Sequence, residues 1–221
     1  RHGETAMNWM GARVVVVGLA RSGVAACLFL HKRGARVVGT DRRTADALGS
    51  LADELKAAGI ELVLGGHPDL TTFDAVILSP GVDPAQDMIT KARDKGLRLL
   101  PELELGALEI KGRIICITGT KGKSTTTTAL SAMLLAAGLD ARAVGNIGAP
   151  ITAHVDGSDE STIFVTEASS FQLETTRDFR PDCAVFLNLF ADHLDRHPTF
   201  VPYADATARI FANHTSADSA I

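Results

Sequence analysis

A lysine and a hydroxyl residue follow a short glycine-containing loop in the middle of this chain. Gly119 and Gly122 lie in the loop, and Lys123 and Ser124 come directly after it. Glycines let backbone N–H groups converge on an anion, a lysine here reaches β- and γ-phosphates, and the hydroxyl binds Mg²⁺. The pattern therefore predicts a site for ATP with Mg²⁺. The residues predicted to contact the nucleotide are Gly119, Thr120, Lys121, Gly122, Lys123, Ser124 and Thr125.

The segments on either side of this loop must hold it in place. Residues 113–118 form an apolar, β-branched run of strand length, and apolar residues recur at helical spacing after Ser124. A strict Walker A pattern has glycine where this chain has Ile117, and a bare Gly-Lys-Ser also fits a turn with a helix-capping serine. The strand before the loop and the helix after it favour phosphate binding. The apolar residues at this helical spacing are Leu130, Met133, Leu134 and Ala137.

A carboxylate follows another apolar run in the same half of the chain. Residues 162–166 predict a buried strand, and Glu167 lies at its carboxyl end. Because α/β sheets carry their functional groups at this end of the strands, we expect Glu167 to bind Mg²⁺ together with Ser124. The alternative is an exposed, solvated acid.

A second glycine pattern lies near the N-terminus. Residues 13–17 predict a strand, 18–23 a loop that opens a helix, and 36–40 a second strand that ends at Asp41. This βαβ unit nearly matches the dinucleotide fingerprint, in which an acid binds a ribose. Ala20 replaces the glycine that lets the backbone approach a pyrophosphate, so NAD binding is the minority interpretation. A turn that binds no phosphate is the other alternative.

Strand and helix patterns alternate along the whole chain and predict an α/β fold. We expect an N-terminal Rossmann-like parallel sheet, followed by a P-loop ATP-binding α/β domain. The expected divisions are a leader at 1–11, a first domain at 12–106 and a second at 107–221. Further helices are expected over 45–58 and 84–95, further strands over 61–64, 74–78, 97–100, 142–144 and 182–187, and a link over 102–112.

Bulk composition excludes some classes of function. The 221 residues carry a net charge of −4, which gives no electrostatic reason to expect nucleic acid or an anionic membrane as a partner. Apolar runs are of strand length, and three scattered cysteines suggest reduced thiols. We therefore expect a cytoplasmic protein, monomeric, with no membrane and no nucleic-acid partner.

Several stretches resemble the Mur ligase family, and within it the branch that adds D-glutamate. The resemblance rests on five motifs and extends from about Met10 onward. These motifs are SPG at 79–81, TGTKGKST at 118–125, GNIG at 145–148, EASSFQLE at 167–174 and DHLDRH at 192–197.

The resemblance implies an ATP-dependent amide-bond ligase of peptidoglycan synthesis, which joins UDP-N-acetylmuramoyl-L-alanine to D-glutamate through an acyl phosphate. It implies catalytic roles for Lys123, Glu167 and His193, with His193 also near a second metal or the substrate. It further implies that one set of residues holds the UDP side of the substrate. That set is Ser22, Asp41, Arg42, Arg43, Gly81 and Asn146.

The chain departs from the family pattern at several places. Lys121 stands where the family has asparagine, 190–191 where it has threonine followed by proline or acid, and Thr207 where it has a carbamylated lysine. The chain also ends at Ile221, so we expect an incomplete central domain and no C-terminal domain. These departures favour the alternative of an inactive nucleotide-binding fragment or degenerate paralogue, and we expect no ligation at a normal rate. An NAD-dependent oxidoreductase is the other alternative.

Overall fold

Two parallel sheets, each with its own helices, make up this protein. The computed structural model describes residues 7–192, 196–197 and 199–221. It divides the chain into unit 1, Arg1–Leu105, and unit 2, Gly106–Ile221. All strand pairs between named strands are parallel, which confirms the predicted α/β class.

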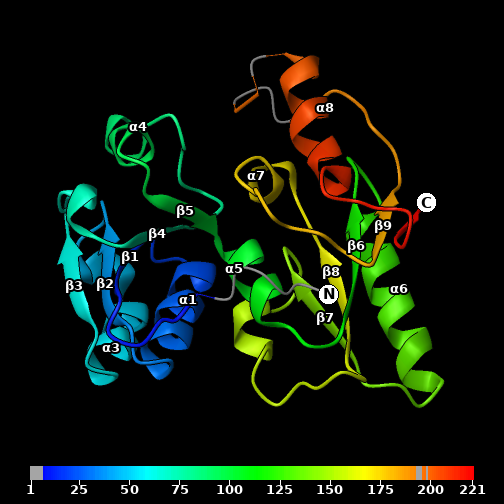
Figure 1. Ribbon diagram of the computed structural model, residues 1–221, viewed down its shortest axis with the longest axis horizontal. Helices are drawn as coiled ribbons and strands as arrows, with labels where there is room; N and C mark the ends of the chain where they lie inside the picture. Colours follow the sequence, from blue (N-terminus) through cyan, green and yellow to red (C-terminus); the bar gives the residue numbers. More distant parts are fainter. Residues whose placement is uncertain (1–6, 193–195, 198) are drawn as a thin grey trace. The chain divides into compact units, whose positions relative to one another are not determined.

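Unit 1 is a doubly wound sheet with the strand order β3-β2-β1-β4-β5 (Figure 1). The chain runs outward from β1 to β3 and then returns to β4 on the other side of β1. This reversal leaves a crevice at the carboxyl ends of β1 and β4, where such sheets bind ligands. The strands are β1 (Arg13–Val17), β2 (Arg36–Asp41), β3 (Glu61–Leu64), β4 (Ala75–Leu78) and β5 (Arg98–Pro101). The helices are α1 (Arg21–Lys32), α2 (Ala45–Leu48), α3 (Ser50–Ala57) and α4 (Asp87–Asp94), with a 3₁₀ turn at Leu70–Thr72.

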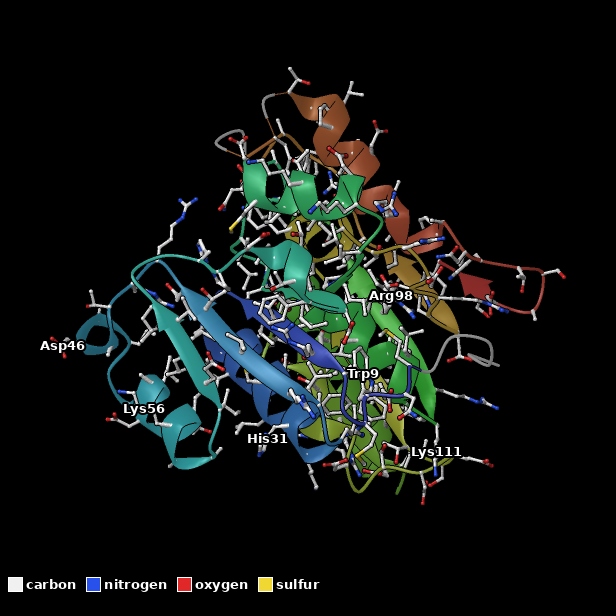
Figure 2. The ribbon with its side chains drawn as sticks, turned by 60° about the vertical axis from the view of Figure 1, so that its left-hand side comes forward. Trp9, His31, Asp46, Lys56, Arg98 and Lys111 are labelled. Carbon is white, nitrogen blue, oxygen red and sulfur yellow. The ribbon has the colours of Figure 1, made fainter. Side chains whose placement is uncertain are left out.

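The centre of unit 1 is the valine run of β1. Its residues Val14 to Val17 are all buried, as expected for a central parallel strand covered on both faces. Each buried valine contributes about 1.5–2 kcal/mol of transfer free energy. Within the predicted leader, Trp9 is only 4% exposed and Gly11 donates its N–H to the carbonyl of Gly34, so this part of the leader belongs to the folded unit (Trp9 labelled in Figure 2).

Three local predictions in unit 1 were wrong in detail. The helix expected over 45–58 is broken into α2 and α3 at Gly49, whose φ of 57° and ψ of −132° are not helical. The helix expected over 84–95 begins only at Asp87, after an extended Gln86. The link expected over 102–112 contains a helix, α5 (Glu102–Glu109), which buries Leu103 and Leu105.

Unit 2 places its first strand at the centre of the sheet. The strand order is β10-β9-β6-β8-β7, so β6 lies between β8 and β9 (Figure 1). The strands are β6 (Arg113–Thr118), β7 (Ala141–Gly145), β8 (Ile163–Glu167), β9 (Cys183–Phe186) and β10 (Ser219–Ala220). The helices are α6 (Lys123–Ala136), α7 (Ser170–Leu173) and α8 (Phe200–Ala208), with 3₁₀ turns at Ile151–His154 and Arg209–Phe211.

Helix α6 follows β6 through the glycine loop, as predicted, and packs against β6, β7 and β8. Thr127 and Ser131 are buried, whereas Met133 is 68% exposed. No helix of the described residues is long and apolar enough to cross a membrane.

Candidate nucleotide sites at two strand edges

The loop between β6 and α6 requires glycine at two positions. Gly119 has φ of 131°, and a Cβ atom there would lie 2.9 Å from the carbonyl oxygen of Asn188. Gly122 has φ of 86° and precedes the first residue of α6, with no side chain capping the helix. Only glycine adopts such backbone angles without strain. The loop therefore brings its backbone close to the next strand end and leaves the α6 N-terminus available to an anion.

Asn188 holds this loop in place from the adjacent strand end. Its Oδ1 accepts from the N–H of Lys121 at 2.9 Å, and its Nδ2 donates to the carbonyl of Lys121 at 2.9 Å. Its own carbonyl accepts from the N–H of Thr120 at 3.0 Å. This residue was not among the predicted site residues. Its position just after β9 is the signal that could have identified it, since β9 pairs with β6.

Lys123 folds back over the loop. Its Nζ donates to the carbonyls of Gly119 at 2.7 Å and Thr120 at 3.0 Å, and the side chain is half-buried rather than fully exposed. Burial lowers the pKa of the ammonium group, while the nearby charges of Glu167 and Asp192 oppose that change. Ser124 and Thr125 lie exposed in the first turn of α6. The predicted phosphate-binding residues are thus gathered at one strand end.

Glu167 is the last residue of β8 and is only 2% exposed, so it is not a solvated surface acid. Its Oε1 accepts from Nδ2 of Asn146 at 2.7 Å, and its backbone carbonyl accepts from the N–H of Asn146 at 2.9 Å. Its Oε2 is buried and has no hydrogen-bond partner among the described residues. A buried carboxylate oxygen without a partner is costly unless a cation or donor satisfies it.

The donor atoms near the loop suit a hard cation such as Mg²⁺, which prefers oxygen ligands. Glu167 offers the unpartnered Oε2, and Ser124 offers an exposed hydroxyl one residue after Lys123. His193, the third predicted metal residue, lies outside the described residues. Within the described part of the chain, no cluster of three or more His, Cys, Asp or Glu residues could hold a metal ion.

The two unusual residues of this region have defined contacts. Lys121 is mostly exposed, and its Nζ lies 3.3 Å from Oδ2 of Asp192. Thr207 is buried in α8, where its hydroxyl donates to the carbonyl of Tyr203 at 2.7 Å. The phenol of Tyr203 in turn lies 2.9 Å from Oγ1 of Thr120 in the loop. The Thr207 hydroxyl is therefore directed to its own helix.

Asp41 is the last residue of β2, and its carboxylate links the loops at the carboxyl ends of the strands in unit 1. Its carboxylate accepts from the N–H of Leu19 at 2.8 Å and from the N–H, Nε and Nη2 of Arg43 at 2.9, 3.0 and 2.7 Å. Burial by itself raises the pKa of Asp41, but the hydrogen bonds and charge of Arg43 and the Leu19 N–H outweigh it and lower the pKa to about 2. A carboxylate with four donors has little capacity left for the ribose that an NAD fingerprint requires.

The loops after β1 and β4 lie side by side at the same edge. Ser79 donates its hydroxyl to the carbonyl of Gly18 at 2.6 Å, and a Cβ atom at Gly23 would lie only 1.8 Å from that carbonyl oxygen. Ser22 lies in the first turn of α1 next to Gly23, and Gly81 has open space around it. The close approach of helix and strand is the role of the last glycine in this type of loop.

Of the six residues predicted to bind the UDP side, five lie in unit 1 and Asn146 lies in unit 2 beside Glu167. At the unit 1 edge, Arg42 donates through Nη2 to Oε1 of Gln86 at 2.6 Å. His67, which follows β3, contacts the end of β2 through Thr40 at 3.0 Å. Gln86 and His67 were not predicted. Each is far along the chain from its contact, so spacing gives no signal for them.

Comparison with known proteins assigns both halves of the chain. Residues 117–221 match the family model of the Mur ligase middle domain. Residues 12–100 match the model described as Mur ligase MurD-like, N-terminal domain.

Relatives of similar sequence have a common name. Proteins from Acidobacterium capsulatum and Geobacter metallireducens, both called UDP-N-acetylmuramoylalanine–D-glutamate ligase, are 45% and 42% identical to this chain. Each match covers 97% of this chain but only 47% and 48% of the relative. The chain thus spans about half the length of the curated relatives it matches.

A solved structure supports the fold. The crystal structure of UDP-N-acetylmuramate:L-alanyl-γ-D-glutamyl-meso-diaminopimelate ligase from Neisseria meningitides matches with a TM-score of 0.62 at 19% identity. The match covers 95% of this chain and 70% of that one. At this identity the likeness concerns the fold alone.

Proposed function

This chain carries the N-terminal and middle domains of the Mur ligase family, and on that premise we propose that it serves an ATP-dependent ligase of peptidoglycan synthesis. The proposed reaction joins D-glutamate to UDP-N-acetylmuramoyl-L-alanine. The names of the relatives support this choice of substrates. In this proposal unit 2 binds ATP and unit 1 binds the uridine nucleotide of the substrate.

The main support for the ATP site comes from Glu167, at the end of the strand next to the glycine loop. Its Oε2 atom is buried and has no hydrogen-bond partner among the described residues. Lys123 is the partner of the phosphates in this proposal. Its ammonium group now donates to two loop carbonyls, and phosphate oxygens would replace those carbonyls as acceptors. The uncapped N-terminus of α6 adds backbone N–H groups and a positive partial charge.

Ser124 and Glu167 would hold Mg²⁺ in this arrangement, with His193 as the third predicted residue. When bound, Mg²⁺ would neutralise part of the phosphate charge. Asn146 would keep the Glu167 carboxylate oriented, because its amide already donates to Oε1.

The substrate chemistry follows from phosphoryl transfer by positioning. The carboxylate of the L-alanine moiety would attack the γ-phosphorus of ATP, so that ADP leaves and an acyl phosphate forms. The amine of D-glutamate would then attack the acyl carbon and release inorganic phosphate. Lys123 would bind the phosphate oxygens during the first step, and the loop fixed by Asn188 would hold the nucleotide in line.

In unit 1, the proposed uridine site uses the strand edge around Asp41, Arg42 and Arg43, with Ser22 and Gly81 from the flanking loops. The four donors to Asp41 count against the ribose contact of an NAD fingerprint, and in the proposed uridine site Asp41 would position the Leu19 N–H and Arg43. We place the protein in the cytoplasm as a monomer. Its three cysteines, which are all free, are consistent with a reducing compartment.

Replacement of the phosphate-loop lysine tests the ATP site. Wild type should be stabilised by ATP with Mg²⁺ in thermal unfolding, by about 2.7 kcal/mol at a ligand concentration 100 times Kd. Lys123→Ala should lose this stabilisation while keeping the melting temperature of the free protein. Lys111→Ala is the matched control, because Lys111 is exposed outside the loop (Figure 2). Equal stabilisation of the Lys123→Ala variant by ATP would refute the assignment.

A second candidate function, nucleotide binding without ligation, is favoured by Thr207. Its hydroxyl is buried and donates to the Tyr203 carbonyl, so it gives the site neither the charge nor the oxygen ligand of a carbamylated lysine. Phosphate release with UDP-N-acetylmuramoyl-L-alanine, ATP and D-glutamate separates the two candidates. Turnover of about 1 per second or faster supports the ligase, and binding of both nucleotides without turnover supports the second candidate.

A further inference from the structure

A second lysine lies in the glycine loop between β6 and α6, two residues before Lys123. Both main-chain groups of Lys121 are bonded to one side chain, because its N–H donates to Oδ1 of Asn188 at 2.9 Å and its carbonyl accepts from Nδ2 at 2.9 Å. The neighbouring N–H of Thr120 donates to the carbonyl of Asn188 at 3.0 Å. The base of the Lys121 side chain is therefore held at a fixed point of the loop.

The far end of the same side chain lies in water. The Lys121 side chain is 76% exposed, and its Nζ lies 3.3 Å from Oδ2 of Asp192, whose side chain is 32% exposed. Among the described residues, this ion pair is the only bond that the ammonium group makes. Ion pairs that water reaches contribute little to stability, because both charges stay solvated when they separate. An anion that binds at the loop can therefore replace Asp192 as the partner of Lys121.

The charge of Lys121 acts on the lysine that is proposed to bind phosphate. Burial is the main cause that lowers the pKa of Lys123, and the positive charge of Lys121 lowers it further. The negative charges of Glu167 and Asp192 oppose both effects. Lys121 is thus close enough to Lys123 for the two ammonium groups to act on the same bound anion.

The two lysines lie on different sides of the loop. Lys123 is half-buried, and its Nζ donates to the carbonyls of Gly119 and Thr120 inside the loop. The backbone N–H groups of such loops cradle the inner phosphates of a nucleotide. Lys121 is exposed, and its partner Asp192 belongs to the segment after β9. Lys121 would therefore meet the part of a polyphosphate chain that projects from the loop.

We propose that Lys121 is a second phosphate-binding lysine, which leaves Asp192 to contact the terminal phosphate of a nucleoside triphosphate and so favours ATP over ADP. The inference rests on the proposed function, in which unit 2 binds ATP. ADP lacks the third phosphate, so in its complex Lys121 stays with Asp192. The contact with ATP is a charge-assisted hydrogen bond, which is stronger than one between neutral groups.

Calorimetric titration of ATP and ADP, each with Mg²⁺, tests the proposal. Lys121→Met keeps an unbranched side chain but removes the charge, so the ratio of ATP affinity to ADP affinity should fall about tenfold. Lys111→Met is the matched control, because it removes an exposed lysine outside the loop, and it should keep the wild-type ratio (Figure 2). A wild-type ratio in Lys121→Met, or an equal loss of affinity for both nucleotides, would overturn the proposal.

Replacement of the acidic partner supplies a second readout of opposite sign. Asp192→Asn removes the charge that competes with phosphate for Lys121, so ATP should bind about threefold more tightly. In Lys121→Met the same substitution should bring no gain, because no ammonium group remains to be released. Asp205→Asn, at an exposed position of α8, is the control and should leave ATP affinity unchanged. Equal gains with and without Lys121 would show a general effect of charge and would contradict the exchange.

The results also separate this inference from the function on which it rests. Failure of wild type to bind either ATP or ADP would overturn the ATP site of unit 2, and the role of Lys121 with it. Binding of both nucleotides by wild type, with a ratio that Lys121→Met leaves unchanged, would keep the ATP site and overturn the role of Lys121 alone.

Discussion

At the carboxyl ends of the strands in both sheets, charged side chains form hydrogen bonds with the backbone of the neighbouring loops. Lys123 donates to the carbonyls of its own loop, and Asp41 accepts from the N–H groups of Leu19 and Arg43. The lysine can exchange its carbonyl acceptors for phosphate, because its side chain is flexible and half-buried. The aspartate has four donors fixed by the fold, so we assign it to shaping the site.

Replacement of Asp41 should therefore affect stability first. Asp41→Asn keeps the shape but removes the charge and places an amide N–H group against donors, which should destabilise the protein by about 1–3 kcal/mol at pH 7. The midpoint of urea unfolding measures this change. Asp46→Asn is the control, because Asp46 is exposed in the first turn of α2 (Figure 2). A variant as stable as wild type would show that the four donors contribute nothing net.

The same residue sets a pH dependence in the acid range. The pKa of Asp41 is about 2 in the folded protein, against about 3.9 in an unfolded chain. The carboxylate therefore contributes stability that is complete above pH 4 and is lost as the pH falls from about 4 to about 2. Urea midpoints over this range should decline less in Asp41→Asn than in wild type. Parallel decline of the two proteins would contradict the assigned contacts.

At the scale of elements, the helix after each glycine loop depends on a residue without a side chain. Gly23→Ala would place a Cβ atom 1.8 Å from the carbonyl oxygen of Gly18, which cannot be relieved by a side-chain rotation. We expect a loss of about 3 kcal/mol, or about 10 °C in melting temperature. Gly81→Ala is the matched control, because its Cβ would meet open space at an ordinary φ. Equal melting temperatures for the two variants would show that α1 does not pack as described.

Strands were easier to predict than helix ends. The valines of β1 form an unbroken apolar run, which fits little other than a central parallel strand. Gly49 breaks the helix expected over 45–58. The break could not be predicted, because helices often tolerate a glycine and its backbone angles cannot be read from the sequence. The apolar spacing of α6 indicates a helix but not its buried residues, because the helix buries Thr127 and Ser131 while Met133 is exposed.

The positions of the candidate site residues were predictable where a residue follows a strand and unpredictable where two distant segments meet. Glu167 ends β8 and Lys123 opens α6 after the loop that follows β6, as predicted, and the pairing of β6 with β8 brings the two positions to the same end of the sheet. Asn188 contacts Lys121 across 67 residues, and His67 contacts Thr40 across 27. No spacing rule links such pairs, because they depend on the order of strands in each sheet.

At the scale of the whole molecule, we propose one nucleotide site in each unit. Unit 2 has the glycine loop with Lys123 and Glu167, and unit 1 has the strand edge with Asp41 and His67. The chain spans about half the length of its curated relatives, and both of its domains match family models over most of their residues. Two separate nucleotide sites in one chain are therefore the central claim.

Calorimetric titration with both ligands tests this claim most directly. ATP with Mg²⁺ should bind one molecule per chain, whether or not the protein is saturated with UDP-N-acetylmuramoyl-L-alanine, and the uridine ligand should also bind one per chain. Lys123→Ala should lose ATP binding and keep the uridine ligand. Competition between the two ligands for one site, or undiminished ATP binding by Lys123→Ala, would contradict the account.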